Sequence, residues 1–125
     1  MDAKLSWTDA RLAEGLKRYR AQEFFVAHEF WESVWLELSE PEKTFLQALI
    51  QVTAAFHHWQ RNNPRGTAAL LEAALRRLSA YPPRFAAIDV TALRGDIRAW
   101  LQALELRDSP ALAFPNIGVD EDDGI

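Results

Sequence analysis

Two side chains that can do chemistry lie four residues apart near the middle of the chain. His28 and Glu32 share one face of any helix formed there, and Glu29 lies beside them. An imidazole next to a carboxylate can bind a divalent metal ion such as Zn²⁺ or Fe²⁺, or the carboxylate can orient the imidazole as a general base. The spacing therefore indicates a metal site or an acid–base site, and it does not distinguish between them.

A second set of polar side chains follows in the next apolar-periodic segment. Gln47, Gln51 and His58 lie within about 40° of one another on a helical wheel, and Arg61 continues the same line. If the two segments form antiparallel helices, the start of the first lies near the end of the second. We therefore expect His28 to approach His58 or Gln51 across a shared cleft.

Three interpretations of this polar face are open. The first is a metal site with His28, Glu32 and His58 as ligands, one position being left for water. The second is a pocket for a small molecule or an anion. The third is a structural network in which the polar groups of facing helices satisfy one another. His57 points about 100° away from His58, which places it at the surface or at the rim of the site.

Apolar residues recur at helical spacing along most of the chain, and no segment alternates as a half-buried strand does. Ser6, Ser39 and either Asp89 or Thr91 are suitable N-cap residues, and Asn, Pro and Gly gather in the turn at residues 62–66. The predicted helices span residues 7–20, 24–38, 40–62, 67–81 and 89–106.

Short connections place sequential helices side by side in antiparallel order. We therefore predict an all-α, single-domain, up-and-down bundle of about five helices over residues 1–110, with the second and third helices as its central pair. The helical periodicity ends after residue 110. Residues 111–125 are predicted to be an extended, partly disordered acidic tail, of which residues 111–117 pack on the bundle as a strap.

The composition excludes several kinds of site and narrows the partners. The chain has no cysteine, which excludes disulfides and cysteine-ligated metal centres. The net charge of −4 comes from four acids in the last six residues, so the rest of the chain has no excess charge to attract nucleic acid. The sequence shows neither a secretory signal nor about 20 consecutive apolar residues. We expect a cytoplasmic protein without a membrane span, and the many aromatic residues are compatible with a homodimer.

Several short motifs together resemble one protein family. They read AHExxExxW at residues 27–35, FLQALIQ at residues 45–51, AAFHH at residues 54–58 and RNNxxG at residues 61–66. This combination is similar to the small, helical bacterial and archaeal family named domain of unknown function 309, over roughly residues 12–83.

The resemblance implies a compact all-helical protein and a set of characteristic polar positions. Carried over by position, these are His28, Glu29, Glu32, Gln47, Gln51, His58, Arg61 and Asn63. The chain departs from the family pattern at Val26, where the family has a glutamate, and at Ala48 and Asn62, where it has glycines. The resemblance implies no reaction, so whether the protein is an enzyme, and with which catalytic residues, is undecided.

The leading hypothesis is a protein that binds a small ligand or a divalent metal ion in a polar cleft between the second and third helices. One alternative is a metal-dependent hydrolase in which His28, Glu32 and His58 hold the metal and Glu29 is the base. Another is a structural or protein-interaction module with no active site.

Overall fold

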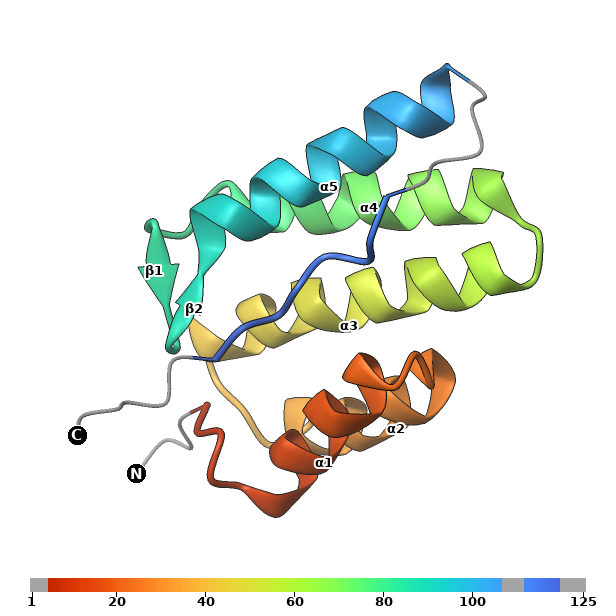
Figure 1. The fold of residues 1–125 in the computed structure, drawn as a ribbon. Coiled ribbons are helices and arrows are strands. Elements are labelled where there is room, and N and C mark those ends of the chain that lie inside the picture. Colours follow the sequence, from red (N-terminus) through yellow and green to blue (C-terminus); the bar gives the residue numbers. More distant parts are fainter. Residues whose placement is uncertain (1–4, 107–111, 120–125) are drawn as a thin grey trace.

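The computed structural model describes residues 5–106 and 112–119, and this part of the chain contains five helices and one short hairpin. Figure 1 shows consecutive helices packed side by side, with α3 between α2 and α4. The prediction of an all-α bundle of about five helices is confirmed. The elements are α1 (Ala10–Arg20), α2 (Phe24–Trp35), α3 (Glu42–Gln60), α4 (Pro64–Leu78), β1 (Arg84–Phe85), β2 (Ile88–Asp89) and α5 (Val90–Glu105).

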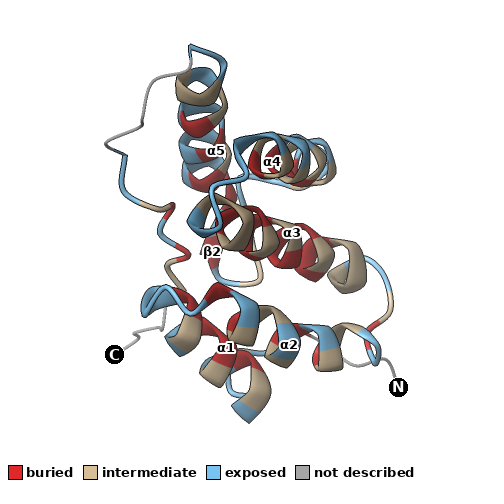
Figure 2. Ribbon diagram, turned by 90° about the vertical axis from the view of Figure 1, so that its right-hand side faces the viewer, coloured by how far each residue is buried: buried red, intermediate tan, exposed pale blue. Residues whose placement is uncertain are grey.

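The core is built around α3, which buries residues along most of its length. Leu46, Leu49, Val52 and Phe56 are fully buried, and the buried residues of all five helices lie on the sides that face one another (Figure 2). This wide apolar face lets α3 contact helices on two sides. Only one narrow stripe of α3 is left for polar groups.

Helices α2 and α3 are antiparallel, as the sequence predicted. The rings of Phe24 at the start of α2 and Phe56 near the end of α3 have centroids 5.8 Å apart. Just before α2, the carbonyl of Gln22 accepts a hydrogen bond of 3.0 Å from the amide Nε2 of Gln60. The N-terminal end of α2 therefore lies beside the C-terminal end of α3.

Three predicted helix starts, those of α1, α3 and α4, are wrong, because other side chains satisfy the first N–H groups. Helix α1 begins at Ala10 and is capped by Asp9, whose carboxylate accepts from the Arg11 N–H at 2.8 Å. Ser6, the predicted cap, instead hydrogen-bonds the Thr8 hydroxyl. Helix α1 therefore begins directly after Asp9, the residue whose side chain accepts from its free backbone N–H groups.

The start of α3 differs from the prediction in the same way. Ser39 was expected to cap the helix, but its Oγ is buried and has no hydrogen-bond partner among the described residues. The carboxylate of Glu40 takes this place, accepting from the Thr44 N–H at 3.0 Å and from the Thr44 hydroxyl at 2.7 Å. Helix α3 therefore begins at Glu42.

Two helices end in the same hydrogen-bonded turn, although neither has glycine at the left-handed position. Gln22 after α1 and Asn62 after α3 have φ values of 63° and 58°. After α3, the Asn63 N–H donates to the His58 carbonyl at 2.9 Å and the Asn62 N–H donates to the Trp59 carbonyl at 3.1 Å. This pair of bonds is a Schellman motif, which explains why the family's glycine position falls at Asn62.

Helices α4 and α5 are capped by side chains at their first turns. Asn63 accepts from the Gly66 N–H at 3.0 Å, so α4 begins at Pro64, three residues before the predicted start. Asp89 accepts from the Ala92 N–H at 2.9 Å, which selects Asp89 over Thr91 as the cap of α5.

The β1–β2 hairpin was not predicted from the sequence. Its two-residue turn is Ala86-Ala87, and both alanines have positive φ values, of 51° and 64°. Such turns favour Asn-Gly or Asp-Gly, so an Ala-Ala pair gives no recognisable signal. The turn is held from outside, because the indole N–H of Trp7 donates to the Ala86 carbonyl at 2.8 Å.

Residues 112–119 run as an extended segment across the bundle, and we call them the strap (Figure 1). Phe114 packs against Phe24, Phe56 and Trp100, with ring centroids 4.9–5.7 Å apart. The Trp100 indole and the Tyr19 hydroxyl donate to strap carbonyls at 3.0 Å and 2.6 Å. The acidic residues 120–125 lie outside the described residues, so the proposed division between bundle and tail stays a prediction.

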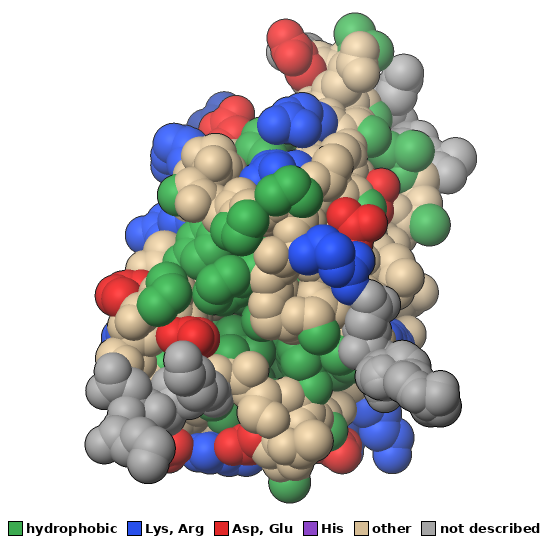
Figure 3. All heavy atoms as spheres, turned by 90° about the vertical axis from the view of Figure 1, so that its left-hand side faces the viewer, with side chains coloured by type: hydrophobic (Ala, Val, Ile, Leu, Met, Phe, Trp, Pro, Cys, Tyr) green, Lys and Arg blue, Asp and Glu red, His purple; other side chains and the backbone are tan. Residues whose placement is uncertain are grey.

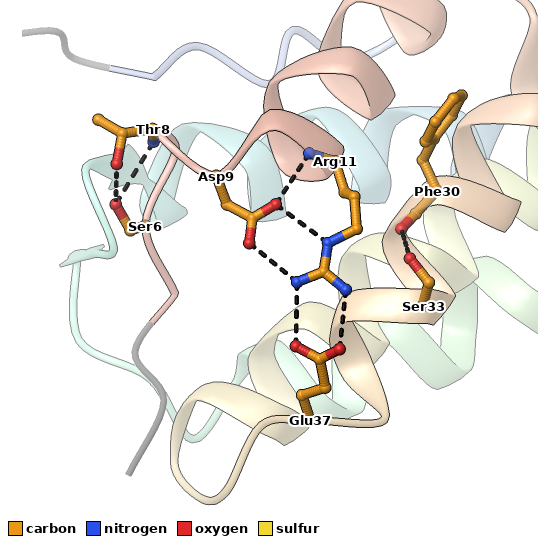
Figure 4. A network of polar contacts seen from close by, with 7 residues as sticks. All are labelled: Ser6, Thr8, Asp9, Arg11, Phe30, Ser33 and Glu37. Carbon is orange, nitrogen blue, oxygen red and sulfur yellow. Dashed lines mark hydrogen bonds and ion pairs between the residues drawn. The ribbon is translucent and has the colours of Figure 1, made fainter. Parts of the chain in front are cut away.

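One arginine joins α1 to the turn after α2 (Figure 4). The Arg11 guanidinium donates to both carboxylate oxygens of Glu37, at 2.8 and 2.9 Å, and also to Asp9. These charge-assisted hydrogen bonds hold the pKa of both carboxyl groups below its usual range. The network is on the surface, so it contributes little to stability. Its role is to fix the position of α1 relative to the turn after α2.

The side of the molecule that carries the hairpin presents a broad band of apolar side chains, with most charged groups around it (Figure 3). Tyr81 and Phe85 pack there against Phe45 and against each other, with ring centroids 4.8–5.1 Å apart. Among the described residues, none of the helices combines the length and the apolar composition that a membrane crossing requires.

Candidate functional site

His28 lies on α2 where the sequence placed it, next to Glu32. Its Nε2 is 3.9 Å from a Glu32 carboxylate oxygen, and the imidazole side chain is 26% exposed. The other ring nitrogen, Nδ1, is buried and has no hydrogen-bond partner among the described residues. The Nε2 atom of His28 therefore faces the surface, and its Nδ1 atom is shielded from solvent.

Four aromatic and imidazole rings form a row across the α2–α3 seam. The Phe25 ring lies 5.9 Å from the His28 ring and 5.3 Å from the His57 ring, measured between centroids. The His57 ring is in turn 6.1 Å from the His58 ring. All three histidines of the chain thus lie in one row with Phe25 between two of them, and we call His28, His57 and His58 the histidine cluster.

The electrostatics of the cluster are seen at His57. Partial burial lowers the pKa of His57, and the positive charge of Arg61 lowers it further. The guanidinium is close enough to disfavour a second positive charge at His57. Burial and Arg61 therefore both favour the neutral form of this imidazole.

Gln51 of α3 lies on the side toward α4. Its side-chain oxygen accepts a long hydrogen bond of 3.5 Å from Arg77 of α4. Gln47, one helical turn earlier, is partly exposed. The Gln51 amide is thus grouped with α4, whereas His57 is grouped with α2.

His58 takes part in the turn between α3 and α4. The amide nitrogen of Asn63 lies 3.2 Å from His58 Nδ1, and the amide oxygen accepts from the Gly66 N–H. An amide NH₂ only donates, so His58 Nδ1 is the acceptor and the proton sits on Nε2. A Cβ at Gly66 would lie 2.6 Å from the Asn63 amide nitrogen and 3.2 Å from His58 Cγ. The contacts of this turn therefore restrict the residue types at positions 58, 63 and 66.

The predicted metal set is not brought together. Among the described residues, no group of three or more His, Asp or Glu side chains lies close enough to hold a metal ion. His58 turns toward Asn63, while His28 and Glu32 lie on α2 across the seam. Glu29, the predicted base of the hydrolase alternative, is exposed on α2. The rings of Phe24 and Phe56 pack against each other between α2 and α3, and the expected polar cleft between these helices stays a prediction.

Sequence reasoning missed two members of the site. Phe25 was expected in the apolar face of α2, but it is 51% exposed. His57 was expected at the rim, and it is the imidazole that faces α2. A signal was present, because residues 43, 47, 50, 54, 57 and 61 follow one helical stripe in which 57 and 61 lie beside the start of an antiparallel α2.

Comparison with known proteins adds to this geometry. Residues 12–70 match the family model described as "Domain of unknown function (DUF309)". The resemblance to this family is therefore confirmed. The DUF309 region covers most of α1, all of α2 and α3 and the first half of α4, and it contains the whole histidine cluster.

A relative extends the similarity beyond the DUF309 region. An "Uncharacterized protein" of Aquifex aeolicus (strain VF5) is 30% identical over 115 residues, which is 88% of this chain and 33% of the relative. The chain thus spans about one third of the length of this relative. The name of the relative assigns no activity, so a functional conclusion has to come from the site itself.

Proposed function

We infer that the protein binds a small anionic ligand at the histidine cluster. The observation that carries this is the row of rings, in which His28 and His57 from two helices flank a half-exposed Phe25. With Arg61 acting on the same imidazole, the site offers cationic donors and one apolar ring. Phosphate and carboxylate groups are the ligands that such donors bind.

An anion fits this site better than a metal ion does. A metal ion needs at least three donors around one point, and the described residues form no such group. The positive charge of Arg61 lowers the pKa of His57, and a bound anion offsets this effect. The Glu32 carboxylate lies beside His28. His57 and Arg61 therefore make the main contribution to anion binding.

The test is calorimetric titration of the full chain with inorganic phosphate at pH 5.5 and pH 7.5. We expect tighter binding at pH 5.5, because a protonated His57 adds one positive charge to the site. Replacing Arg61→Gln should weaken binding at least fivefold, and His57→Gln should weaken binding at pH 5.5 more than at pH 7.5.

Arg98→Gln is the matched control, because Arg98 is an exposed arginine on α5, away from the α2–α3 seam. It changes the net charge by the same amount as Arg61→Gln and should leave the affinity unchanged. Equal losses in the two variants would mean that phosphate responds only to net charge. That result, or the absence of phosphate binding at either pH, would refute the proposal.

A further inference from the structure

A hollow of about 400 Å³ lies between the C-terminal end of α1 and the strap. It is lined by Tyr19, Arg20, Gln22 and residues 112–116. This volume is within the range of about 300–1,000 Å³ that small-molecule sites occupy. The hollow is separate from the histidine cluster, since it shares none of the rings of that row.

Arg20 is the charged side chain of this hollow, and it differs from the other arginines of α1. Arg11 and Arg18 each form ion pairs with two carboxylates. Arg20 donates one hydrogen bond of 3.2 Å, to the carbonyl of Ile117, and no carboxylate among the described residues forms an ion pair with it. Its remaining guanidinium donors are therefore available to an anionic group.

The lining of the hollow is about equally polar and apolar, and its apolar part lies mainly on the strap. Leu112 is 41% exposed, and Phe114 and Pro115 form the adjoining surface of the strap. The Tyr19 hydroxyl is already used, since it donates to the Pro115 carbonyl at 2.6 Å. Tyr19 thus contributes its ring rather than a free polar group. A ligand that fits would have one negative charge at Arg20 and an apolar chain along the strap.

We propose that this hollow binds a small organic carboxylate with an aliphatic chain. The carboxylate meets the guanidinium of Arg20, and the chain lies on Leu112, Phe114 and Pro115. Because half of the site is made by the strap, the ligand also ties the strap to α1. The proposal does not depend on the histidine cluster, since the two sites use different residues.

The experiment is an NMR titration of the full ¹⁵N-labelled chain with octanoate, and in parallel with 1-octanol as the uncharged match. Octanoate should shift the backbone signals of residues 19–22 and 112–116, and 1-octanol should do so at least tenfold more weakly. Arg20→Gln should weaken octanoate binding at least tenfold, whereas Arg20→Lys, which keeps the charge, should retain most of it.

Three controls make the outcome decisive. Arg98→Gln should not change the octanoate affinity, and inorganic phosphate should not displace octanoate. Arg20→Gln removes the hydrogen bond to the Ile117 carbonyl, so without ligand its strap signals should match the wild type except next to Ile117, which shows that the strap is still in place. Unaltered binding by Arg20→Gln, equal binding of 1-octanol, or shifts confined to the histidine cluster would overturn the proposal. So would the absence of any shift at millimolar octanoate.

Discussion

Gly15 shows how one residue type can be required by a single neighbour. The indole of Trp31 lies directly on Gly15, and its N–H donates to the Leu12 carbonyl at 3.1 Å. A Cβ at position 15 would overlap the indole ring. The glycine, which is unfavourable inside a helix, is therefore the residue that lets α1 approach α2.

We predict that Gly15→Ala lowers the free energy of unfolding by about 1–3 kcal/mol, because the fully buried Trp31 cannot move aside without strain. Urea denaturation followed by circular dichroism measures this change. The matched control is Gly95→Ala on α5, where a Cβ would meet nothing within 4 Å. That variant should gain about 0.5–1 kcal/mol from helix propensity. A stabilised Gly15→Ala variant would show that Trp31 does not pack on this position.

The two adjacent histidines of α3 have different roles although the sequence presents them as a pair. His58 accepts a hydrogen bond from Asn63 in the α3–α4 turn, and His57 lies against Phe25 of α2. Neighbouring positions on a helix differ by about 100°. Which of the two histidines faces α2 therefore depends on how α3 is rotated about its axis. Because α3 is apolar over a wide face, periodicity alone leaves that rotation undetermined.

At the scale of elements, the α3–α4 turn accounts for several of the polar positions that resemble the family. Asn63 caps α4 and bonds His58, and Gly66 leaves the space that both need. Asn62 occupies the left-handed position of the helix end. These turn residues are explained by the hydrogen bonds they make at the helix ends. That explanation does not extend to Phe25, His28, His57 and Arg61, which lie outside these bonds.

Asn63→Ala should cost about 1 kcal/mol of stability, the usual effect of removing an N-cap side chain. Asn62→Gly should instead be neutral or stabilising by a few tenths of a kcal/mol, because glycine adopts positive φ without cost. Thermal unfolding of the two single variants beside the wild type measures both effects. If Asn63→Ala unfolds at the wild-type temperature, the cap seen here does not contribute to the stability of α4.

At the scale of the whole molecule, the fold was predictable because apolar residues with helical period cover most of the chain. The antiparallel α2–α3 pair followed from the short connection at residues 36–41. The hairpin was not predictable, because its Ala-Ala turn is held by a distant indole from Trp7. The capping roles of Asp9 and Glu40 were missed for a similar reason, since several nearby side chains could cap and packing selects one.

The candidate site was predictable only in part. The structure brings His28 and His57 to one row of rings on the second and third helices, and whether this row is a binding site stays a prediction. The expected convergence of His28, Glu32 and His58 was wrong in geometry, because His58 is held by the turn to α4. The exposed ring of Phe25 could not be foreseen, since a phenylalanine in an apolar stripe is usually buried.

The central claim is that the Arg61 guanidinium lowers the pKa of His57 and that a bound anion raises it again. The most direct measurement is an NMR pH titration of the His57 imidazole, with and without inorganic phosphate. Without phosphate, the pKa of His57 should lie below the ordinary value of 6.5, and saturating phosphate should raise it. A pKa at or above 6.5 without phosphate, or one that phosphate leaves unmoved, would contradict this account.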